Sequence, residues 1–451
     1  MNKQVDKIIE SKRGEMIATL KESVSIRSVK GDPKPGAPFG TEVKRALMSF
    51  LAKAEQLGFS CYERDGYYGC IDYGEGKETL AVLAHLDVVP EGEGWTHAPY
   101  GGEIENERMY GRGTMDDKGP AVSALYALYA IKEAGFLGDR KVRLILGCDE
   151  ESGCNCINHY KKLEKEPEIA FSPDAEYPVV NSEKGIIHAA FEKKYPTEIK
   201  IDCGTVPNVV PGIAKIFVPL SKTEVEAAAS SCGFPVSISE AKNGVNIEIT
   251  GLSAHASMPE SGDNALISTL ELLLKLNLKE QDLALIREIN AAFDRESHGK
   301  LMDLDFSDAS GRTTVSPSIL KIDENGLTML VIDLRLPTSL NLNDVKAKIE
   351  KSLPNLKLIH ASLTNGHFVD KDSELVTKLL ASYNGRKGGV GEPKAIGGGT
   401  YAKAFKNAVA FGCEMPGEIS TVHMPDEFLD LNELMFNAYV MADAIMSLMV
   451  K

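Results

Sequence analysis

The first half of the chain alternates between stretches with the apolar spacing of strands and stretches with that of helices. Residues 79–84 (TLAVLA) form an almost unbroken apolar run, which predicts a strand covered on both faces. A second such run, KVRLILGC at 141–148, predicts another buried strand. Between them, after DDKG at 116–119, apolar residues recur at helical spacing: Val122, Leu125, Leu128, Tyr129 and Ile131. This order predicts two parallel strands joined by a helix.

The pattern changes twice along the rest of the chain. Residues 14–57 are predicted to be mostly helical, and short strands around Cys61 and Ile71 flank a turn. From about Lys184 to about Asp370, strands alternate with long charged helices, which is typical of a separate α+β domain. The chain then returns to helices, including a glycine-rich turn (GGGTYAKAF) predicted to open a helix and an amphipathic C-terminal segment. We therefore expect an α/β fold with one inserted domain.

Composition narrows the classes of partner. The 451 residues include 50 basic and 65 acidic ones, a net charge of −15, which argues against nucleic acid and anionic membranes as partners. The N-terminal residues lack the apolar core of a signal peptide, and no segment approaches the ~20 apolar residues of a membrane span, so we expect a cytoplasmic protein. The eight cysteines form no dense framework, and the C-x-C pair Cys154 and Cys156 is left out of the predicted site.

Ionisable residues follow the predicted strands where each strand ends. His85 and Asp87 follow the first buried strand, Glu150 and Glu151 the second, and Asp174 a short strand, EIAFS. Ligands of open α/β sheets gather at the carboxyl ends of strands. A lone histidine there is more often an ordinary core residue. Together with Asp116 and His423, however, so many acids would repel one another unless cations lay between them.

The types of side chain indicate the kind of cation. Histidine and carboxylate ligands suit zinc, with manganese or cobalt as alternatives, and the lack of ligand cysteines disfavours a structural thiolate site. We therefore predict two divalent metal ions. Glu150 and Glu151 are adjacent, so on an extended segment their side chains point in opposite directions, and one can bind metal while the other acts as a general base.

Other polar positions are unremarkable by themselves. The turn formed by Gly398, Gly399, Thr400 and Tyr401 could hold an anion with its backbone amides, but it lacks the lysine of a nucleotide-binding loop. His255, Arg335 and Asn208 lie in the predicted inserted domain. Each would be taken as an ordinary polar residue if nothing else were known.

Several motifs in order resemble one family over nearly the whole chain. They are AHLDVVPEGEGW, YGRGTMDDKGP, DEESG, SPDAEYPV with SEKGI, GLSAHASMPE and STVHMPDE. Together they resemble the PepV-type bacterial dipeptidases, in the dinuclear-zinc metallopeptidase superfamily of aminoacylases, carnosinases and desuccinylases. The resemblance implies a zinc-peptidase-like catalytic domain with a mixed sheet in an α/β/α arrangement, formed by residues 1–183 and 370–451. An α+β lid domain, residues 184–369, would be inserted into it.

The resemblance also implies a role for each site residue. Asp116 would bridge two metals, with His85 and Asp174 completing one ligand set and Glu151 and His423 the other. Asp87 would orient His85, and Glu150 would be the general base and acid acting on a water molecule between the metals. His255 would stabilise the tetrahedral oxyanion, while Asn208, Arg335 and the turn at 398–401 would bind substrate. At Asp117 the family typically has a cis peptide bond.

The implied activity is hydrolysis of small dipeptides that have a free amino terminus, with β-alanyl dipeptides such as carnosine among the candidates. We expect a monomer rather than a dimer. Three alternatives stay open. They are a deacylase or desuccinylase acting on N-acyl amino acids, a noncatalytic binding protein on the same fold, and a nucleotide-binding α/β protein. The last lacks a convincing phosphate loop, and the second would be expected to have lost Glu150 or a metal ligand.

Overall fold

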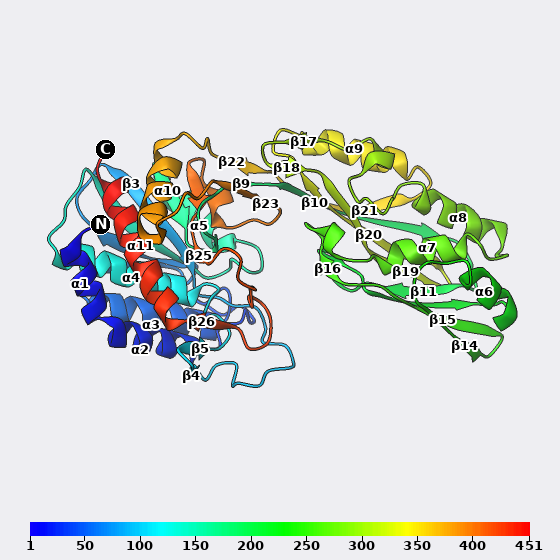
Figure 1. The fold of residues 1–451 in the computed structure, drawn as a ribbon, viewed down its shortest axis with the longest axis horizontal. Coiled ribbons are helices and arrows are strands. Elements are labelled where there is room, and N and C mark those ends of the chain that lie inside the picture. The colour runs from blue at the N-terminus through cyan, green and yellow to red at the C-terminus, as the bar shows by residue number, and fades with distance from the viewer. The chain divides into compact units, whose positions relative to one another are not determined.

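The computed structural model describes residues 1–451, which form two compact units (Figure 1). The first unit comprises Met1–Asn181, Val369–Lys394 and Gly399–Lys451. The second comprises Ser182–Phe368 and the short segment Ala395–Gly398. The chain therefore leaves the first unit once to build almost all of the second, and returns to it for its C-terminal part.

A mixed sheet forms the centre of the first unit. In spatial order its strands are β1 (Ser60–Arg64), β2 (Tyr68–Tyr73), β6 (Arg140–Gly147), β3 (Glu78–His85), β7 (Ile169–Ser172), β24 (Ala408–Ala410), β9 (Val180–Glu183) and β22 (His367–Phe368), with β23 (Lys394–Ile396) paired to β9. The last three lie where the chain passes between the units. The predicted mixed-sheet α/β architecture is confirmed.

The strand–helix–strand unit predicted from the apolar runs is present. β3 pairs in parallel with β6 and with β7, and its last residue, His85, lies opposite Gly147 at the end of β6. Nearly every residue of β3 and β6 is buried, as expected of strands covered on both faces. The carboxyl ends of these strands therefore meet at one edge of the sheet, where the polar residues begin.

Helices cover both faces of this sheet. They are α1 (Lys3–Ser11), α2 (Arg13–Val24), α3 (Thr41–Gln56), α4 (Lys118–Glu133), α5 (Asn155–Leu163), α10 (Glu374–Lys387) and α11 (Leu431–Met449). Tyr68 of β2 stacks edge-on against Tyr160 of α5, whereas the next residue, Gly69, faces leucines of α3. Successive strand residues point to opposite faces, so α3 and α5 cover different sides. Helix α4 is buried between the sheet and other helices, including α11.

Three features of the first unit differ from the expectations or were not predicted. The segment after the glycine-rich turn forms only a short 3-10 turn, η3 (Tyr401–Ala404), because the chain straightens at Phe405 to enter β24. Helix α1 was not predicted, although Asn2 caps it by accepting bonds from the amides of Gln4 and Val5. Short sheets formed by β4 (Glu103–Glu105), β5 (Arg108–Tyr110) and β26 (Phe428–Asp430), and by β8 (Ala175–Glu176) and β25 (Cys413–Glu414), were also missed.

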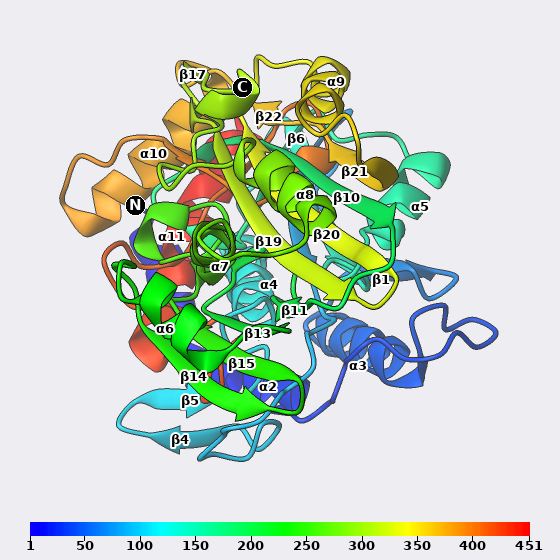
Figure 2. The ribbon, with the colours of Figure 1, turned by 90° about the vertical axis from the view of Figure 1, so that its right-hand side faces the viewer.

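The second unit is built on one antiparallel sheet. In spatial order its strands are β14 (Val236–Ala241), β15 (Gly244–Thr250), β13 (Ile213–Val218), β11 (Lys200–Cys203), β19 (Thr314–Asp323), β20 (Gly326–Leu336), β10 (Gly185–Lys194) and β21 (Lys357–Thr364). Its helices are α6 (Lys222–Ala229), α7 (Ala265–Leu273), α8 (Glu280–Asn290) and α9 (Leu342–Ser352). Alternate strand residues, such as Leu330 and Ile332 of β20, share one apolar cluster with helix residues, so the helices cover one face of the sheet (Figure 2).

Smaller elements complete the second unit. They are β12 (Val209–Val210), β16 (Ala254–His255), η1 (Pro259–Ser261), η2 (Lys300–Met302), β17 (Ser307–Asp308) and β18 (Gly311–Arg312). The strands β12 and β16 pair with each other, and β12 and η1 both contact β19. This small two-stranded sheet therefore lies beside the long central strands of the unit.

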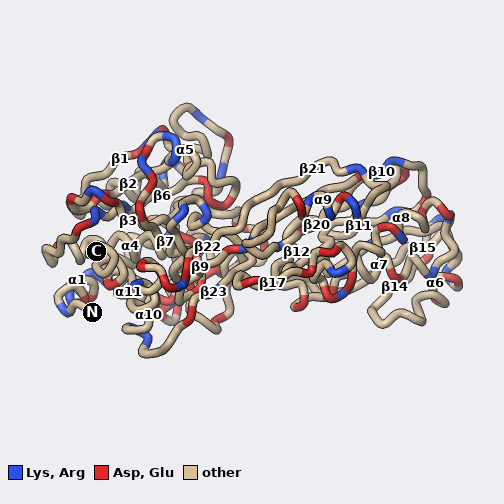
Figure 3. The backbone as a smooth tube through the Cα atoms, turned by 90° about the horizontal axis from the view of Figure 1, so that it is seen from above, with Lys and Arg blue, Asp and Glu red and all other residues tan.

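Charged residues of both signs are distributed over each unit. Figure 3 shows Lys and Arg positions interspersed with Asp and Glu positions along the backbone, in keeping with the acidic balance of the sequence. None of the helices combines the length and the apolar character that crossing a lipid bilayer requires.

Candidate active site

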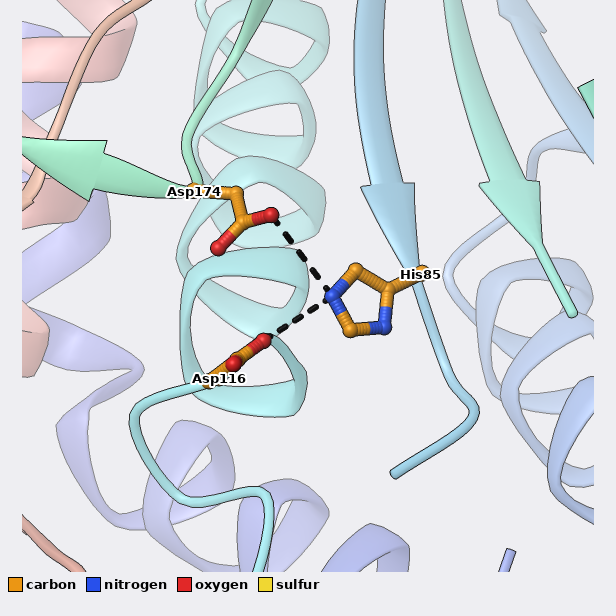
Figure 4. Close-up of side chains that lie close together, drawn as sticks. All are labelled: His85, Asp116 and Asp174. Atoms are coloured by element: carbon orange, nitrogen blue, oxygen red, sulfur yellow. Dashed lines mark ion pairs between the residues drawn. The ribbon is translucent and has the colours of Figure 1, made fainter. Parts of the chain in front are cut away.

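Three of the predicted metal ligands meet at the carboxyl end of the parallel strands. His85 is the last residue of β3, Asp116 lies in the loop before α4, and Asp174 follows β7 by two residues. His85 Nε2 is 2.9 Å from Asp116 Oδ1 and 3.7 Å from Asp174 Oδ2. Figure 4 shows the imidazole pointing towards both carboxylates. These three side chains form a group that could hold a metal ion.

A second group shares Asp116 with the first. His423 Nε2 lies 2.9 Å from Asp116 Oδ2 and 3.1 Å from Glu151 Oε1. The two oxygens of the Asp116 carboxylate therefore face two different imidazoles, those of His85 and His423, which are far apart in the sequence. Each group offers three ligand atoms that lie within 4.8 Å of one another. Asp116 is thus placed to bridge two neighbouring cations.

Unpaired polar atoms and perturbed pKa values show that both groups suit cations. His85 Nε2 and Asp116 Oδ1 are buried and, although they lie 2.9 Å apart, neither makes a hydrogen bond. Burial, together with the nearby Asp116, raises the pKa of Glu151 and of Asp174. Although burial opposes it, hydrogen bonding to Asp116 and Glu151 raises the pKa of His423 to about 10. The acids thus favour positive charge at these positions, and divalent ions with neutral imidazole ligands would satisfy the same groups.

Asp87 connects the first group to the loop that carries the two adjacent glutamates. The main-chain carbonyl of Asp87 accepts a hydrogen bond from His85 Nδ1 at 3.0 Å, so a neutral His85 ring would present an unprotonated Nε2 to a metal ion. The carboxylate of Asp87 lies 3.6 Å from the same ring nitrogen. Its two oxygens accept bonds from the amides of Glu150 and Glu151, both at 3.2 Å. Asp87 therefore fixes the histidine and the glutamate loop together.

The two adjacent glutamates have different surroundings. Glu151 contacts His423, whereas Glu150 belongs to neither of the two ligand groups. Burial, with the neighbouring acids Asp174 and Glu151, raises the pKa of Glu150 well above its usual range, although His85 opposes this shift. Because Glu150 lies outside both ligand groups, its carboxylate is free for a role in proton transfer, to which a raised proton affinity is suited. The peptide bond between Asp116 and Asp117 is cis.

In the second unit, Asn208 and His255 come together at the two-stranded sheet of β12 and β16. Val209 pairs with His255 between β12 and β16, and the carbonyl of Asn208 accepts a bond from the Ala256 amide at 2.9 Å. His255 Nδ1 accepts a bond from the Ser257 amide at 3.2 Å, so the neutral ring carries its proton on Nε2. Partial burial and the nearby Arg335 guanidinium lower the pKa of His255. His255 is exposed and therefore offers a neutral N–H donor to solvent.

Arg335, on β20, is held by its neighbours. Its Nε and Nη2 donate to the two oxygens of Asp333 at 2.8 and 2.7 Å, and Nη1 donates to the Gly397 carbonyl at 2.7 Å. His188 Nε2 lies 2.7 Å from Asp333 Oδ2. Arg335 is only 3% exposed and Asp333 is fully buried. The guanidinium is therefore fixed in direction by a buried carboxylate.

The glycine-rich turn has residues of two kinds. A side chain at Gly398 would meet nothing within 4 Å, so open space lies beside this half-buried residue, whereas one at Gly399 would crowd Lys403. Thr400 caps η3 by accepting a bond from the Ala402 amide. The Tyr401 side chain is 2% exposed, packs edge-on against His85, and its hydroxyl lies 2.8 Å from Cys156 Sγ. It therefore supports the site from within the unit, and only its backbone could face a ligand.

Three supporting residues were not anticipated from the sequence. Ser257 lies two positions after His255, and Asp333 lies two positions before Arg335. Residues two apart on a strand share a face, so the sequence could have indicated that Asp333 contacts Arg335. Glu427 lies four residues after His423, and its buried carboxylate binds the loop that carries Asp116. Its partners are mostly backbone amides distant in sequence, which no motif reveals.

Comparison with known proteins identifies the family. The model of "Peptidase family M20/M25/M40" matches residues 81–447. The chain belongs to this peptidase family. The matched range includes both groups of candidate ligands as well as Asn208, His255 and Arg335, so the M20 assignment covers both units.

Relatives of this M20 protein match it over nearly its full length. YtjP of Bacillus subtilis (strain 168) is 34% identical over 466 residues, covering 99% of this chain and 100% of the relative. A protein named Beta-Ala-Xaa dipeptidase, from Lactobacillus delbrueckii subsp. lactis, is 30% identical over 465 residues and is covered to 99%, as is this chain. Among solved structures, human carnosine dipeptidase 1 has the same fold, with a TM-score of 0.62, 16% identity and coverage of 99% of this chain and 98% of that chain.

Proposed function

We propose that this M20 enzyme is a metal-dependent dipeptidase that hydrolyses the peptide bond of dipeptides with a free amino terminus, at a centre for two divalent cations. The observation that carries the proposal is the placement of Asp116, whose two carboxylate oxygens each lie 2.9 Å from a different histidine. The full-length similarity to a Beta-Ala-Xaa dipeptidase supports the substrate class and makes β-alanyl dipeptides candidates.

The proposed ligand sets divide between the two groups. His85 and Asp174 would hold one cation, Glu151 and His423 the other, and Asp116 both. The mixture of imidazole and carboxylate ligands favours zinc, with manganese or cobalt as alternatives. Bound cations would lower the pKa of a water molecule and polarise the carbonyl of the peptide bond.

The residues around this centre would handle the proton and the position of the groups. Glu150, with its raised pKa, would take a proton from the attacking water and return it to the nitrogen of the leaving amine. Asp87 would keep the His85 proton on Nδ1 and would hold the Glu150 amide, so that base and ligand keep their relative positions. General acid–base catalysis of this kind commonly contributes ~10²- to 10⁴-fold in rate.

Residues of the second unit would bind the substrate and the transition state. The Nε2–H of His255 would donate to the developing oxyanion, since Nδ1 is already an acceptor for the Ser257 amide. Arg335, Asn208 and the backbone of the turn at Gly398 would bind the polar ends of the dipeptide.

Two alternatives predict different results in one experiment. A deacylase or desuccinylase of this superfamily would prefer an N-acyl amino acid, and a noncatalytic protein would hydrolyse neither substrate. The test compares a free dipeptide, a β-alanyl dipeptide, the matching N-acetyl amino acid and a tripeptide extension, after chelation and after return of Zn²⁺, Mn²⁺ or Co²⁺. We expect metal-restored turnover on the dipeptides and little on the other two. Preference for the N-acetyl amino acid, or full turnover in metal-free protein, would refute the proposal.

A further inference from the structure

Two adjacent acids follow His423 and bind two different loops. Asp426 is partly exposed and accepts bonds from the Thr96 and His97 amides at 2.9 and 3.0 Å. Glu427 points elsewhere, and its side chain is fully buried. One short segment, residues 423–427, therefore carries a candidate ligand and two anchors.

The carboxylate of Glu427 collects the donors of the loop that presents Asp116. Its Oε1 accepts bonds from the amides of Gly113 and Met115, both at 3.0 Å, and of Asp116 at 3.3 Å. Its Oε2 accepts a 2.6 Å bond from Arg112 Nη1, and this arginine is itself 1% exposed. Without Glu427, these buried backbone donors would lack their acceptor, which is costly.

This arrangement links the positions of Asp116 and His423. Glu427 lies four residues after His423 and binds the loop that ends in Asp116, so it joins the two segments whose side chains meet at 2.9 Å. The other ligand group depends less on this link, because His85 ends β3 and Asp174 closely follows β7, and both strands belong to the central sheet. Only Asp116 connects that group to the Glu427 segment.

We propose that Glu427 is a positioning residue for the cation held by Asp116, Glu151 and His423, and that it controls the affinity of this position more than that of the other. The inference rests on the proposed two-cation centre. Glu427 belongs to neither candidate ligand group, and acts through the loop of Asp116. Partners that orient metal ligands typically contribute about 10- to 100-fold in metal affinity.

The decisive variant is Glu427→Gln, which keeps the shape of the side chain. Its amide group must place an NH₂ towards either Arg112 or the three backbone amides, so donors face donors on one side. We expect one Zn²⁺ to bind as in the wild type and the other about 10- to 100-fold more weakly. Equilibrium dialysis with metal analysis would then show the bound ions falling from two towards one at limiting Zn²⁺.

Matched variants separate this inference from its basis. Asp426→Asn changes the adjacent acid, which anchors Thr96 and His97 instead, and should keep two ions. Glu151→Ala removes a candidate ligand and should lose one ion. If Glu427→Gln binds two ions tightly while Glu151→Ala binds only one, the proposed role of Glu427 is wrong but the two-cation centre stands. Two tight ions in Glu151→Ala would instead overturn the proposed centre.

A second variant and a local readout guard against general unfolding. Glu427→Asp keeps the charge but is one methylene shorter, so it cannot reach Arg112 and the amides together, and it should weaken the same ion. In either folded variant, hydrogen exchange of residues 113–116 should become faster, while the far-UV circular dichroism and the exchange of β3 stay as in the wild type. Unchanged exchange at Gly113 and Met115 would contradict the proposed link.

Discussion

Replacing Asp333 by Asn should destabilise the second unit, because the buried Arg335 would lose its charge partner. Arg335 donates two bonds to this carboxylate and is 3% exposed, so the variant leaves a guanidinium with little access to water. Removing one partner of a buried ion pair typically costs about 3–5 kcal/mol. The Asn oxygen can still accept one bond, which recovers roughly 1 kcal/mol. We therefore expect a loss of about 3 kcal/mol in the free energy of unfolding, by combining these two magnitudes.

The assay can use the single tryptophan of the chain as an internal reference. Trp95 lies in the first unit, so its fluorescence during urea unfolding follows that unit, whereas far-UV circular dichroism follows both. Asp333→Asn should lower the urea concentration at which the second unit unfolds, as seen by circular dichroism. The unfolding curve followed by Trp95 fluorescence should stay unchanged. Asp202→Asn is the matched control, because this acid pairs with Lys321 on the exposed face of the same sheet and should cost below about 1 kcal/mol.

The effect should also depend on pH in a defined direction. Burial by itself would raise the pKa of Asp333. Hydrogen bonds from His188 and Arg335 outweigh this effect, so the pKa of Asp333 is lowered in the folded protein. A group whose folded pKa is lowered contributes stability above its unfolded pKa of about 3.9, and loses it as the pH falls through the folded value. The difference in the free energy of unfolding between wild type and Asp333→Asn should therefore have its full value at pH 7 and become smaller below about pH 4. Equal stability at pH 7 would refute the reasoning.

Two further predictions concern residues with proposed catalytic roles. Glu150→Gln should keep both metal ions and lose ~10²- to 10⁴-fold in turnover, measured by steady-state kinetics beside metal content, because it removes the proton acceptor but no ligand; turnover at the wild-type rate would reject this glutamate as the base. His255→Ala should retain metal and fold while kcat falls ~10²- to 10³-fold, the usual cost of one oxyanion donor, with a smaller change in KM; an unchanged kcat would remove His255 from the mechanism.

Much of the fold could be predicted because burial leaves a clear pattern in the sequence. β3 and β6 are covered on both faces, so their apolar runs identified them, and their parallel pairing followed from the helix between them. The turn before η3 was misjudged because a glycine-rich turn signals that a helix begins but not how long that helix is. Helix α1 was missed although Asn2 is a typical N-cap residue, since only Val5 and Ile9 of the helix are buried.

The candidate site could be predicted only in part, for a related reason. His85, Glu150 and Glu151 follow buried strands, so position alone singled them out. His423 lies in a loop and has a backbone φ of 63°, and only the resemblance to a family connected it with Asp116. The role of Glu427 could not be foreseen, because its amide partners are more than 300 residues away and carry no side-chain signature. The apolar pattern of a local segment indicates which residues are buried, but hydrogen bonds to backbone amides far along the chain leave no pattern in the sequence.

The discontinuity of the first unit has a consequence for biosynthesis. When residues 1–181 leave the ribosome, β7 still lacks its neighbour β24 and α4 lacks its cover α11, because both come from the C-terminal part of the chain. The second unit consists almost entirely of Ser182–Phe368 and can fold as soon as this segment is made. Residues 1–181 still expose apolar surface at that stage. A chain ended after Phe368 should accordingly resist protease only in this middle stretch; equal resistance of residues 1–181 would contradict the order. The proposed cation site of Asp116, Glu151 and His423 is therefore completed only after the second unit has been synthesised, since His423 follows that unit in the chain.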